Sequence, residues 1–282
     1  MGEVLTAAAI MAGLALFFAV ILATAYALLR VEEDPRIDDV EGMLPGSNCG
    51  ACGSPGCRAF AELLVGGGAA PGKCTVNSAA GTEAIAGYLG VDAGGEEKRV
   101  ARLKCAGGQG LAGELAGYVG LSSCRAAAIT NGGGRACEWG CLGLGDCARA
   151  CGFDAITMSA RGLPVVSLEG CTACNDCVEV CPLDLLVLAP AAGELLVQCN
   201  SPLKGAEARS RCDVACDACG RCAADAPAGA ITMERGLPVV HRDAPARGTA
   251  AATYRCPTGA IQWVDGQQFP EETGVLTRGS HA

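Results

Sequence analysis

Cysteines are the residues of this 282-residue chain that could do chemistry, because there are 20 of them at regular spacings. One run reads Cys171-x2-Cys174-x2-Cys177-x3-Cys181 and is followed by Pro182. Thiolates at these gaps can ligate [4Fe-4S] cubes, the first three binding one cube and the fourth another. The run therefore predicts a pair of iron–sulfur clusters whose remaining ligands come from elsewhere in the chain.

The cysteine pattern repeats after 75 residues. With that shift, Cys124, Cys137, Cys141, Cys147 and Cys181 fall without a gap on Cys199, Cys212, Cys216, Cys222 and Cys256. Four cysteines have no counterpart, because Cys151, Cys171, Cys174 and Cys177 become Ala226, Ala246, Thr249 and Ala252. The joint loss of four cysteines is the loss of one cube. We therefore predict two tandem bacterial-ferredoxin-like modules, the first with two clusters and the second with one.

The predicted ligands of these modules form three groups. In each of the first two runs the fourth cysteine binds the cluster of the other run. One cluster is therefore bound by Cys137, Cys141, Cys147 and Cys181, and another by Cys151, Cys171, Cys174 and Cys177. The third group is Cys216, Cys219, Cys222 and Cys256. Cys212 competes with Cys219, and we favour Cys219 because two-residue gaps let successive thiolates meet one cube.

Four cysteines remain outside these groups: Cys105, Cys124, Cys199 and Cys212. We expect them to be small buried hydrophobic residues. The alternatives are a fifth metal site or a regulatory thiol pair.

A fourth ligand group lies upstream, where Cys49, Cys52 and Cys57 are followed by Cys74. Glycines between them allow positive φ and bring backbone N–H groups close to sulfur. Residues 58–65 are expected to form a short helix. Zinc knuckles and disulfide scaffolds also use cysteines, but zinc does not require ligands that cross between motifs, and so many metal ligands imply a reducing compartment. We predict four [4Fe-4S] clusters in total.

An uncharged apolar run occupies residues 4–29. As a helix it would reach about 39 Å, which is enough to cross a hydrocarbon core of ~30 Å. A cleaved signal peptide is the alternative, but the run is too long and its start carries Glu3 and no basic residue. Arg30 and Arg36 orient the helix only weakly. Because clusters are assembled inside the cell, we expect a single-pass anchor in the inner (cytoplasmic) membrane with the iron–sulfur domains on the cytoplasmic side.

The predicted fold class is α+β, with hairpin strands at 156–158 and 164–166 and at their repeats 231–233 and 238–240. Aromatic residues make up 4% of the chain and glycines number 41, so metal binding must supply much of the folding energy. The expected domains are a transmembrane anchor (1–30), an acidic juxtamembrane linker (31–44), a four-cysteine domain (45–90), a connecting segment (91–136), the two-cluster module (137–190), the one-cluster module (191–265) and a tail (266–282).

The net charge of −9 makes nucleic acid an unsuitable partner, and each oxidised cube with four thiolates adds about −2. Docking of an acidic protein would need a basic patch, for which Lys98, Arg99, Arg102 and Lys104 are the candidates, with a solvated helix face as the alternative. We identify no P-loop, no Gly-x-Gly-x-x-Gly after a strand, and only His241 and His281 as histidines, so no catalytic residue is predicted. These residue types indicate electron transfer between partners.

The apolar N-terminal helix, the glycine-rich run that ends at Cys57, the spacing Cys137-x3-Cys141-x5-Cys147 and the ferredoxin repeats resemble the B subunits of Rnf-type ion-translocating ferredoxin:NAD oxidoreductases. The resemblance covers nearly the whole chain. It implies a protein that accepts electrons from reduced ferredoxin and passes them to other membrane and flavoprotein subunits, which reduce NAD and move Na⁺ or H⁺. Gly152 in the place of a proline and the four lost cysteines are departures, and the latter argue against a fourth ferredoxin-type cluster.

Two other functions stay open. The same clusters would serve a membrane-bound donor that keeps a redox-sensing regulator reduced. The four-cysteine domain could instead be a docking module for a corrinoid protein, since a similar domain occurs in corrinoid iron–sulfur proteins.

Overall fold

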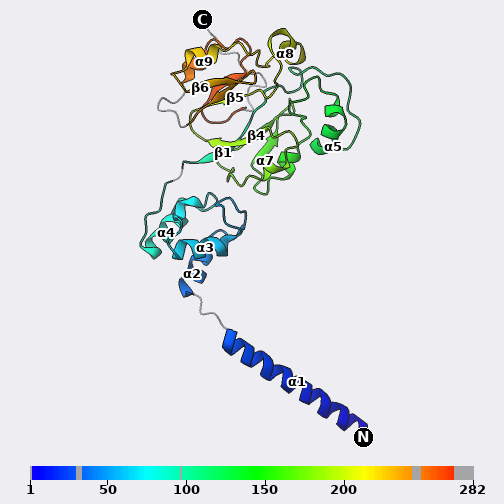
Figure 1. Ribbon diagram of the computed structural model, residues 1–282, viewed down its shortest axis with the longest axis vertical. Helices are drawn as coiled ribbons and strands as arrows, with labels where there is room; N and C mark the ends of the chain where they lie inside the picture. Colours follow the sequence, from blue (N-terminus) through cyan, green and yellow to red (C-terminus); the bar gives the residue numbers. More distant parts are fainter. Residues whose placement is uncertain (1, 30–33, 96, 243–248, 270–282) are drawn as a thin grey trace.

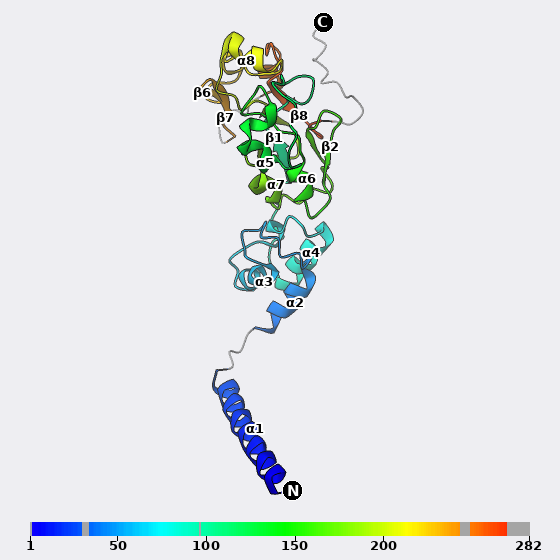
Figure 2. The same cartoon turned by 90° about the vertical axis from the view of Figure 1, so that its right-hand side faces the viewer.

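The computed structural model describes residues 2–29, 34–95, 97–242 and 249–269. Three parts follow one another along its long axis: a single helix, a small helical domain and a larger part that carries the strands (Figures 1 and 2). Several predicted features lie outside the described residues, namely residues 30–33 at the junction of anchor and linker, Ala246, His281 and the tail from residue 270 onward.

The first part is helix α1, Gly2–Leu29. Its segment Leu5–Leu28 has a mean hydropathy of 2.5, and none of the most apolar window is buried inside the protein. Phe17, Leu22 and Leu28 are exposed like their neighbours, so apolar side chains cover the helix surface. By length and composition this helix can cross a membrane, which agrees with the predicted anchor.

The second part packs short helices around a small apolar core. They are α2 (Pro35–Met43), α3 (Cys57–Val65), the 3-10 turn η1 (Pro71–Lys73) and α4 (Ala79–Leu89). Val40, Phe60, Leu64 and Ile85 form the centre of this core and are all at most 2% exposed. The helix predicted at 58–65 is confirmed as α3.

Helix α2 corrects the predicted acidic linker at 31–44. Its N-cap Asp34 accepts a hydrogen bond from the Arg36 N–H, and Ile37, Val40 and Leu44 point to the core at helical spacing. The acidic residues occupy the opposite face, where Asp38 and Glu41 lie 2.9 Å and 2.8 Å from Arg58. The segment is therefore an amphipathic helix of the second domain.

Two hairpins of the third part confirm the predicted strands. Strand β2 (Ile156–Met158) pairs with β3 (Pro164–Val166), and β6 (Ile231–Glu234) pairs with β7 (Leu237–Val240). Both pairs are antiparallel and occupy equivalent places in the 75-residue repeat.

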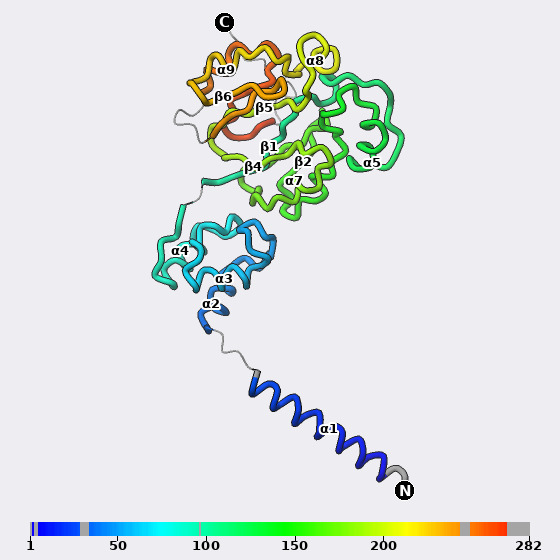
Figure 3. Tube along the Cα trace, viewed as in Figure 1, coloured from blue at the N-terminus to red at the C-terminus, as the bar shows by residue number. Residues whose placement is uncertain are grey.

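Two further sheets join segments that are distant in the chain. Strand β1 (Arg99–Leu103) pairs with β4 (Leu186–Pro190), and β5 (Glu194–Val197) pairs with β8 (Ile261–Val264) (Figure 3). Because β1 comes from the segment 91–136, that segment is part of the first module's sheet and not only a connection between domains.

Strand β1 also corrects the expectation for the basic segment around Arg102. The Arg102 side chain is 1% exposed, and its guanidinium donates to the carbonyl oxygens of Gly266 (2.6 Å) and Ala191 (3.0 Å). The segment is a buried strand and not a solvated helix face. Arg102 holds chain segments together and is not available to a docking partner.

Short helices complete the third part: α5 (Cys124–Ile129), η2 (Asn131–Gly134), α6 (Asp146–Arg149), α7 (Asp176–Val180), α8 (Gly205–Arg211), α9 (Arg221–Asp225) and η3 (Ala250–Thr253). Where the second copy lacks cysteines, Ala226 and Ala252 pack with Leu195, Ile231 and Ile261. Apolar contacts fill the space there.

Removal of residues 1–30 should leave a soluble protein that keeps its iron. The deletion ends before the α2 cap at Asp34 and before the first cysteine, Cys49, while it removes the exposed apolar surface that needs lipid. Ultracentrifugation and iron analysis of the truncated and full-length chains measure both properties. A truncated chain that sediments with membranes in the absence of other subunits would contradict the single-anchor prediction.

Candidate metal centres

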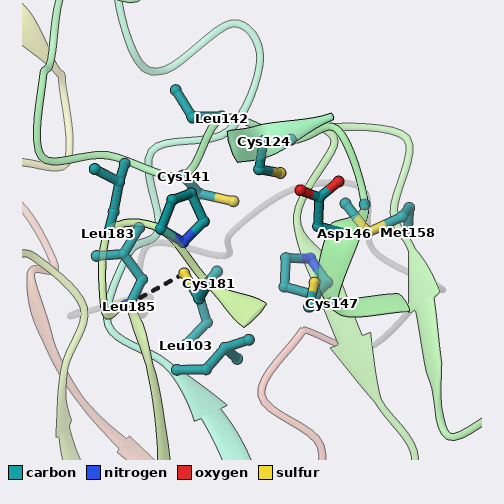
Figure 4. A pocket seen from close by; sticks show the side chains of 15 residues that line it. Leu103, Cys124, Cys141, Leu142, Asp146, Cys147, Met158, Cys181, Leu183 and Leu185 are labelled. Carbon is teal, nitrogen blue, oxygen red and sulfur yellow. Dashed lines mark hydrogen bonds between the residues drawn. The ribbon is translucent and has the colours of Figure 1, made fainter. Parts of the chain in front are cut away.

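Four cysteines line one apolar pocket in the first module: Cys124, Cys141, Cys147 and Cys181 (Figure 4). Leu103, Met158, Pro182 and Leu185 are among the other residues around this space. The sequence analysis grouped Cys137 with the last three cysteines, whereas Cys137 is not among the residues that line the pocket. The pocket therefore contains Cys124, which the predicted group leaves out, and does not contain Cys137.

A partly buried carboxylate brings Cys124 to this pocket. Asp146, which precedes Cys147, accepts hydrogen bonds from the Ser123 hydroxyl (3.0 Å) and the Arg125 N–H (3.1 Å) at the start of α5, and it also pairs with Arg149. Burial alone would raise the Asp146 pKa, but the hydrogen bonds from α5 hold it below its usual value. Asp146 is therefore ionised at neutral pH and fixes the start of α5 beside Cys147.

Three cysteine loops share one backbone shape, which explains the need for Cys124. The second and fourth residues after the first cysteine all have positive φ: Gly143 and Gly145 after Cys141, Ala173 and Asn175 after Cys171, and Ala218 and Gly220 after Cys216. The third residue is Cys174 in one loop and Cys219 in another, but Leu144 in the loop of Cys141. Cys124 supplies a thiol to the loop that lacks its middle cysteine. The alignment of Leu144 with Cys219 was the available sequence signal.

The structure brings the other two predicted groups of the modules together. Cys151, Cys171, Cys174 and Cys177 line one pocket, with Phe153 and Leu188 beside them. Cys216, Cys219, Cys222 and Cys256 line another pocket, with Met233 and Pro238. Cys212 is not among the residues that line this second pocket, so the geometry favours Cys219 in that group.

The upstream cysteines lie against the core of the helical domain. Cys52, Cys57 and Cys74 pack on the buried residues of that core, and the Asn48 side chain, next to Cys49, accepts a hydrogen bond from the Cys57 N–H (2.8 Å). A Cβ atom on Gly56 would lie 2.9 Å from the same Asn48 oxygen, so glycine is required at this turn. The hydrogen bond from Cys57 to Asn48 closes the loop between Cys49 and Cys57.

Backbone N–H groups are aimed at sulfur in a repeated way. The Leu185 N–H donates to the Cys181 sulfur and the Ala155 N–H to the Cys151 sulfur, each at 3.4 Å. These two cysteines are the crossing ligands of the predicted pair of clusters, and each donor lies four residues downstream. Donors of this kind stabilise negative charge on a ligated thiolate.

Burial makes the thiolate form costly when no metal is bound. It raises the pKa of Cys147 to about 11 and that of Cys177 and Cys216 to about 12, with neighbouring thiols adding to the shift. These thiols are protonated at neutral pH, so metal binding has to replace protons and stabilise the buried charge.

Cysteine thiols can bind either a single zinc ion or an iron–sulfur cube. In the described ranges, no three Cys, His, Asp or Glu side chains converge on one point as ligands of one metal ion would. Tetrahedral zinc needs its sulfur ligands within about 4 Å of one another, whereas the four iron atoms of a cube each bind a separate thiolate. The buried sulfurs and the directed N–H groups fit iron–sulfur clusters.

The variant Cys124→Ala should lose about 4 Fe per chain because it removes one ligand of the first-module pocket. Ser122→Ala is the matched control, since Ser122 is exposed two residues before Cys124. Iron and acid-labile sulfide after anaerobic reconstitution measure the loss. Full iron in Cys124→Ala would show that Cys124 is not a ligand.

The variant Cys219→Ala should likewise lose about 4 Fe and one EPR signal, while the signals of the first module stay. Thr232→Ala, at an exposed position of β6 in the same module, should keep all of its iron. Unchanged EPR spectra and iron content in Cys219→Ala would remove this residue from the ligand set.

Comparisons with known proteins agree with an iron–sulfur protein of a membrane complex. A family model described as a putative Fe-S cluster matches residues 44–76. The B subunit of the Na⁺-translocating ferredoxin:NAD⁺ oxidoreductase complex of Acetobacterium woodii is 40% identical, over 87% of this chain and 74% of the relative. The B subunit of the ion-translocating oxidoreductase complex of Methanosarcina acetivorans is 36% identical, over 90% of this chain and 96% of the relative. The B subunit of the proton-translocating ferredoxin:NAD⁺ oxidoreductase complex of Clostridium ljungdahlii is 38% identical, over 93% of this chain and 93% of the relative. With matches at these identities over most of both chains, the protein belongs to the family of B subunits of ion-translocating oxidoreductase complexes.

Proposed function

We propose that this protein accepts electrons from reduced ferredoxin and passes them to the membrane and flavoprotein subunits of an Rnf-type complex that reduces NAD and moves Na⁺ or H⁺. The observation that carries the proposal is that one chain gathers cysteines into three apolar pockets and holds a further cysteine loop against the core of its helical domain. The names of the relatives support the choice of partners, since two of them include ferredoxin and NAD⁺.

Four groups would each hold one [4Fe-4S] cluster in this proposal. They are Cys49, Cys52, Cys57 and Cys74; Cys151, Cys171, Cys174 and Cys177; Cys124, Cys141, Cys147 and Cys181; and Cys216, Cys219, Cys222 and Cys256. A bound cluster of this kind supplies a one-electron centre. The protein provides the ligands, a dry apolar surround and N–H groups directed at sulfur.

Two contacts support electron transfer between three of these groups. The Thr75 hydroxyl, next to Cys74, donates to the Thr172 carbonyl oxygen, next to Cys171, at 2.5 Å. This bond joins the helical domain to the first module through residues adjacent to two proposed ligands. Within that module the Cys177 thiol lies close enough to Cys147 for the two charges to interact. The upstream group and both groups of the first module are thus neighbours.

The anchor and the redox requirement support a location. Helix α1 would hold the protein in the cell's inner membrane, and the thiols of the metal groups must stay reduced until the clusters are assembled. We therefore place the four-cysteine domain, the two-cluster module and the one-cluster module on the cytoplasmic side. In the second module, the apolar packing of Ala226 and Ala252 supports a single cluster.

One glycine motif bears on the choice of electron donor. Contrary to the sequence expectation, Gly108-x-Gly110-x-x-Gly113 does follow a strand, β1. It opens no helix, since residues 104–123 contain none, and the Gly113 N–H donates to the Arg211 carbonyl oxygen at 2.9 Å. A dinucleotide site of this type needs a helix N-terminus for the pyrophosphate. The motif thus gives NADH no binding site here.

Reduced ferredoxin should therefore bleach the visible absorbance of the reconstituted full-length protein in detergent, and NADH alone should not. A hydride donor transfers two electrons and needs a flavin or a similar acceptor, which one-electron centres do not replace. Stopped-flow absorbance under anaerobic conditions compares the two donors, with dithionite as the positive control. Rapid bleaching by NADH without added flavoprotein, or none by reduced ferredoxin, would contradict the proposed direction of electron entry.

A further inference from the structure

Cys105, Cys137, Cys199 and Cys212 take no part in the four groups, yet the structure gathers them at the junction of the two modules. Gly107 shows how close two of them are. A Cβ atom on Gly107 would lie 2.8 Å from the Cys212 sulfur and 3.8 Å from the Cys105 sulfur. Both sulfurs therefore lie close to Gly107, and a side chain there would collide with the Cys212 sulfur.

Backbone contacts bring the other two cysteines to the same place. The Ala106 N–H donates to the Gln198 carbonyl oxygen (3.0 Å), which sets Cys105 beside Cys199, and Cys199 packs on the buried Cys212. Arg211 donates through its guanidinium to the Ala136 carbonyl oxygen (3.1 Å), which sets Cys137 beside Cys212.

The surroundings of these thiols match those of the proposed ligands. Cys105, Cys137 and Cys212 are 6%, 8% and 7% exposed, and all four cysteines are unpaired. The Cys141 N–H donates to the Cys105 sulfur at 3.3 Å. The N–H groups of Trp139 and Val214 face the sulfurs of Cys137 and Cys212, as those of Gly143 and Ala218 face the sulfurs of Cys141 and Cys216. Cysteines that act only as small buried hydrophobic residues do not need backbone N–H groups directed at their sulfurs.

We propose that Cys105, Cys137, Cys199 and Cys212 ligate a fifth [4Fe-4S] cluster, so that all 20 cysteines belong to five groups of four. Four thiols from separate chain segments, with a backbone N–H group directed at one of the sulfurs, fit the ligand set of a cube.

The position of the site gives it a role, which rests on the proposed electron-transfer function. On one side, Cys141 contributes its thiol to the first-module pocket and its N–H to the Cys105 sulfur. On the other side, Cys199 lies close enough to Cys216, in the second-module pocket, for their charges to interact. The fifth site stands between the cluster sites of the two modules and bridges them.

The test uses the reconstituted full-length chain and counts metal. Wild-type protein should contain about 20 Fe, and Cys199→Ala should contain about 16. Ser210→Ala, an exposed substitution on α8 two residues from Cys212, should keep the wild-type amount. Native mass spectrometry under anaerobic conditions should show the same loss as about 350 Da, the mass of one cube, and zinc is measured in every sample.

Double variants decide which cysteines share a cluster. Cys137→Ala with Cys199→Ala should lose no more iron than either single variant, because both remove the same site. Cys124→Ala with Cys199→Ala should lose about 8 Fe, because two sites are removed. A loss of about 8 Fe from the first pair would overturn the group.

Other outcomes separate this inference from the proposed function. A wild-type chain with about 16 Fe, unchanged in Cys105→Ala and Cys199→Ala, would overturn the fifth site and leave electron transfer through four clusters intact. One zinc per chain that disappears in Cys199→Ala would overturn the identity of the metal. The wild-type metal content and mass decide between four and five clusters even if a variant fails to fold.

Discussion

The rest of this structure depends on one constraint, which is the free-energy cost of burying cysteine thiolates that have no metal bound. The modules place protonated thiols among leucine, valine and alanine side chains, where a bare thiolate would be strongly destabilised. A bound cluster would offset this cost, because its iron atoms would stabilise the thiolates and join cysteines from separate chain segments. Short strands and helices of four to seven residues suffice around such centres. The low content of aromatic residues has the same reason, because metal binding supplies part of the folding energy that a larger apolar core would otherwise supply.

Segments with local patterns were predictable, and segments that depend on distant contacts were not. The hairpins at β2–β3 and β6–β7 and the helix α3 follow from patterns within a few residues, and the loops of Cys171 and Cys216 follow from their gaps. The place of Cys124 depends on Asp146, 22 positions downstream, which hydrogen-bonds the start of α5. Cysteine spacing alone provides no reason to prefer it to Cys137.

Two other differences have the same origin. The strand β1 is recognisable only with its partner β4, which lies more than 80 residues downstream, so the basic segment does not reveal its sheet by itself. The Arg102 side chain of β1 binds the carbonyl oxygens of Ala191, just after β4, and Gly266, just after β8. For α2 the helical spacing of Ile37, Val40 and Leu44 is present in the sequence, but the acidic residues of the solvent face are more conspicuous.

The origin of Cys124 in α5 and the pairing of β1 with β4 bear on modularity. The stretch 137–190 looks like a small ferredoxin that could be excised, yet it lacks a thiol of its own pocket and one strand of its own sheet. Fusion or swapping of this stretch between homologous chains would transfer an incomplete unit. An exchange that keeps this unit whole has to begin ahead of β1, in the short connection between the helical domain and that strand.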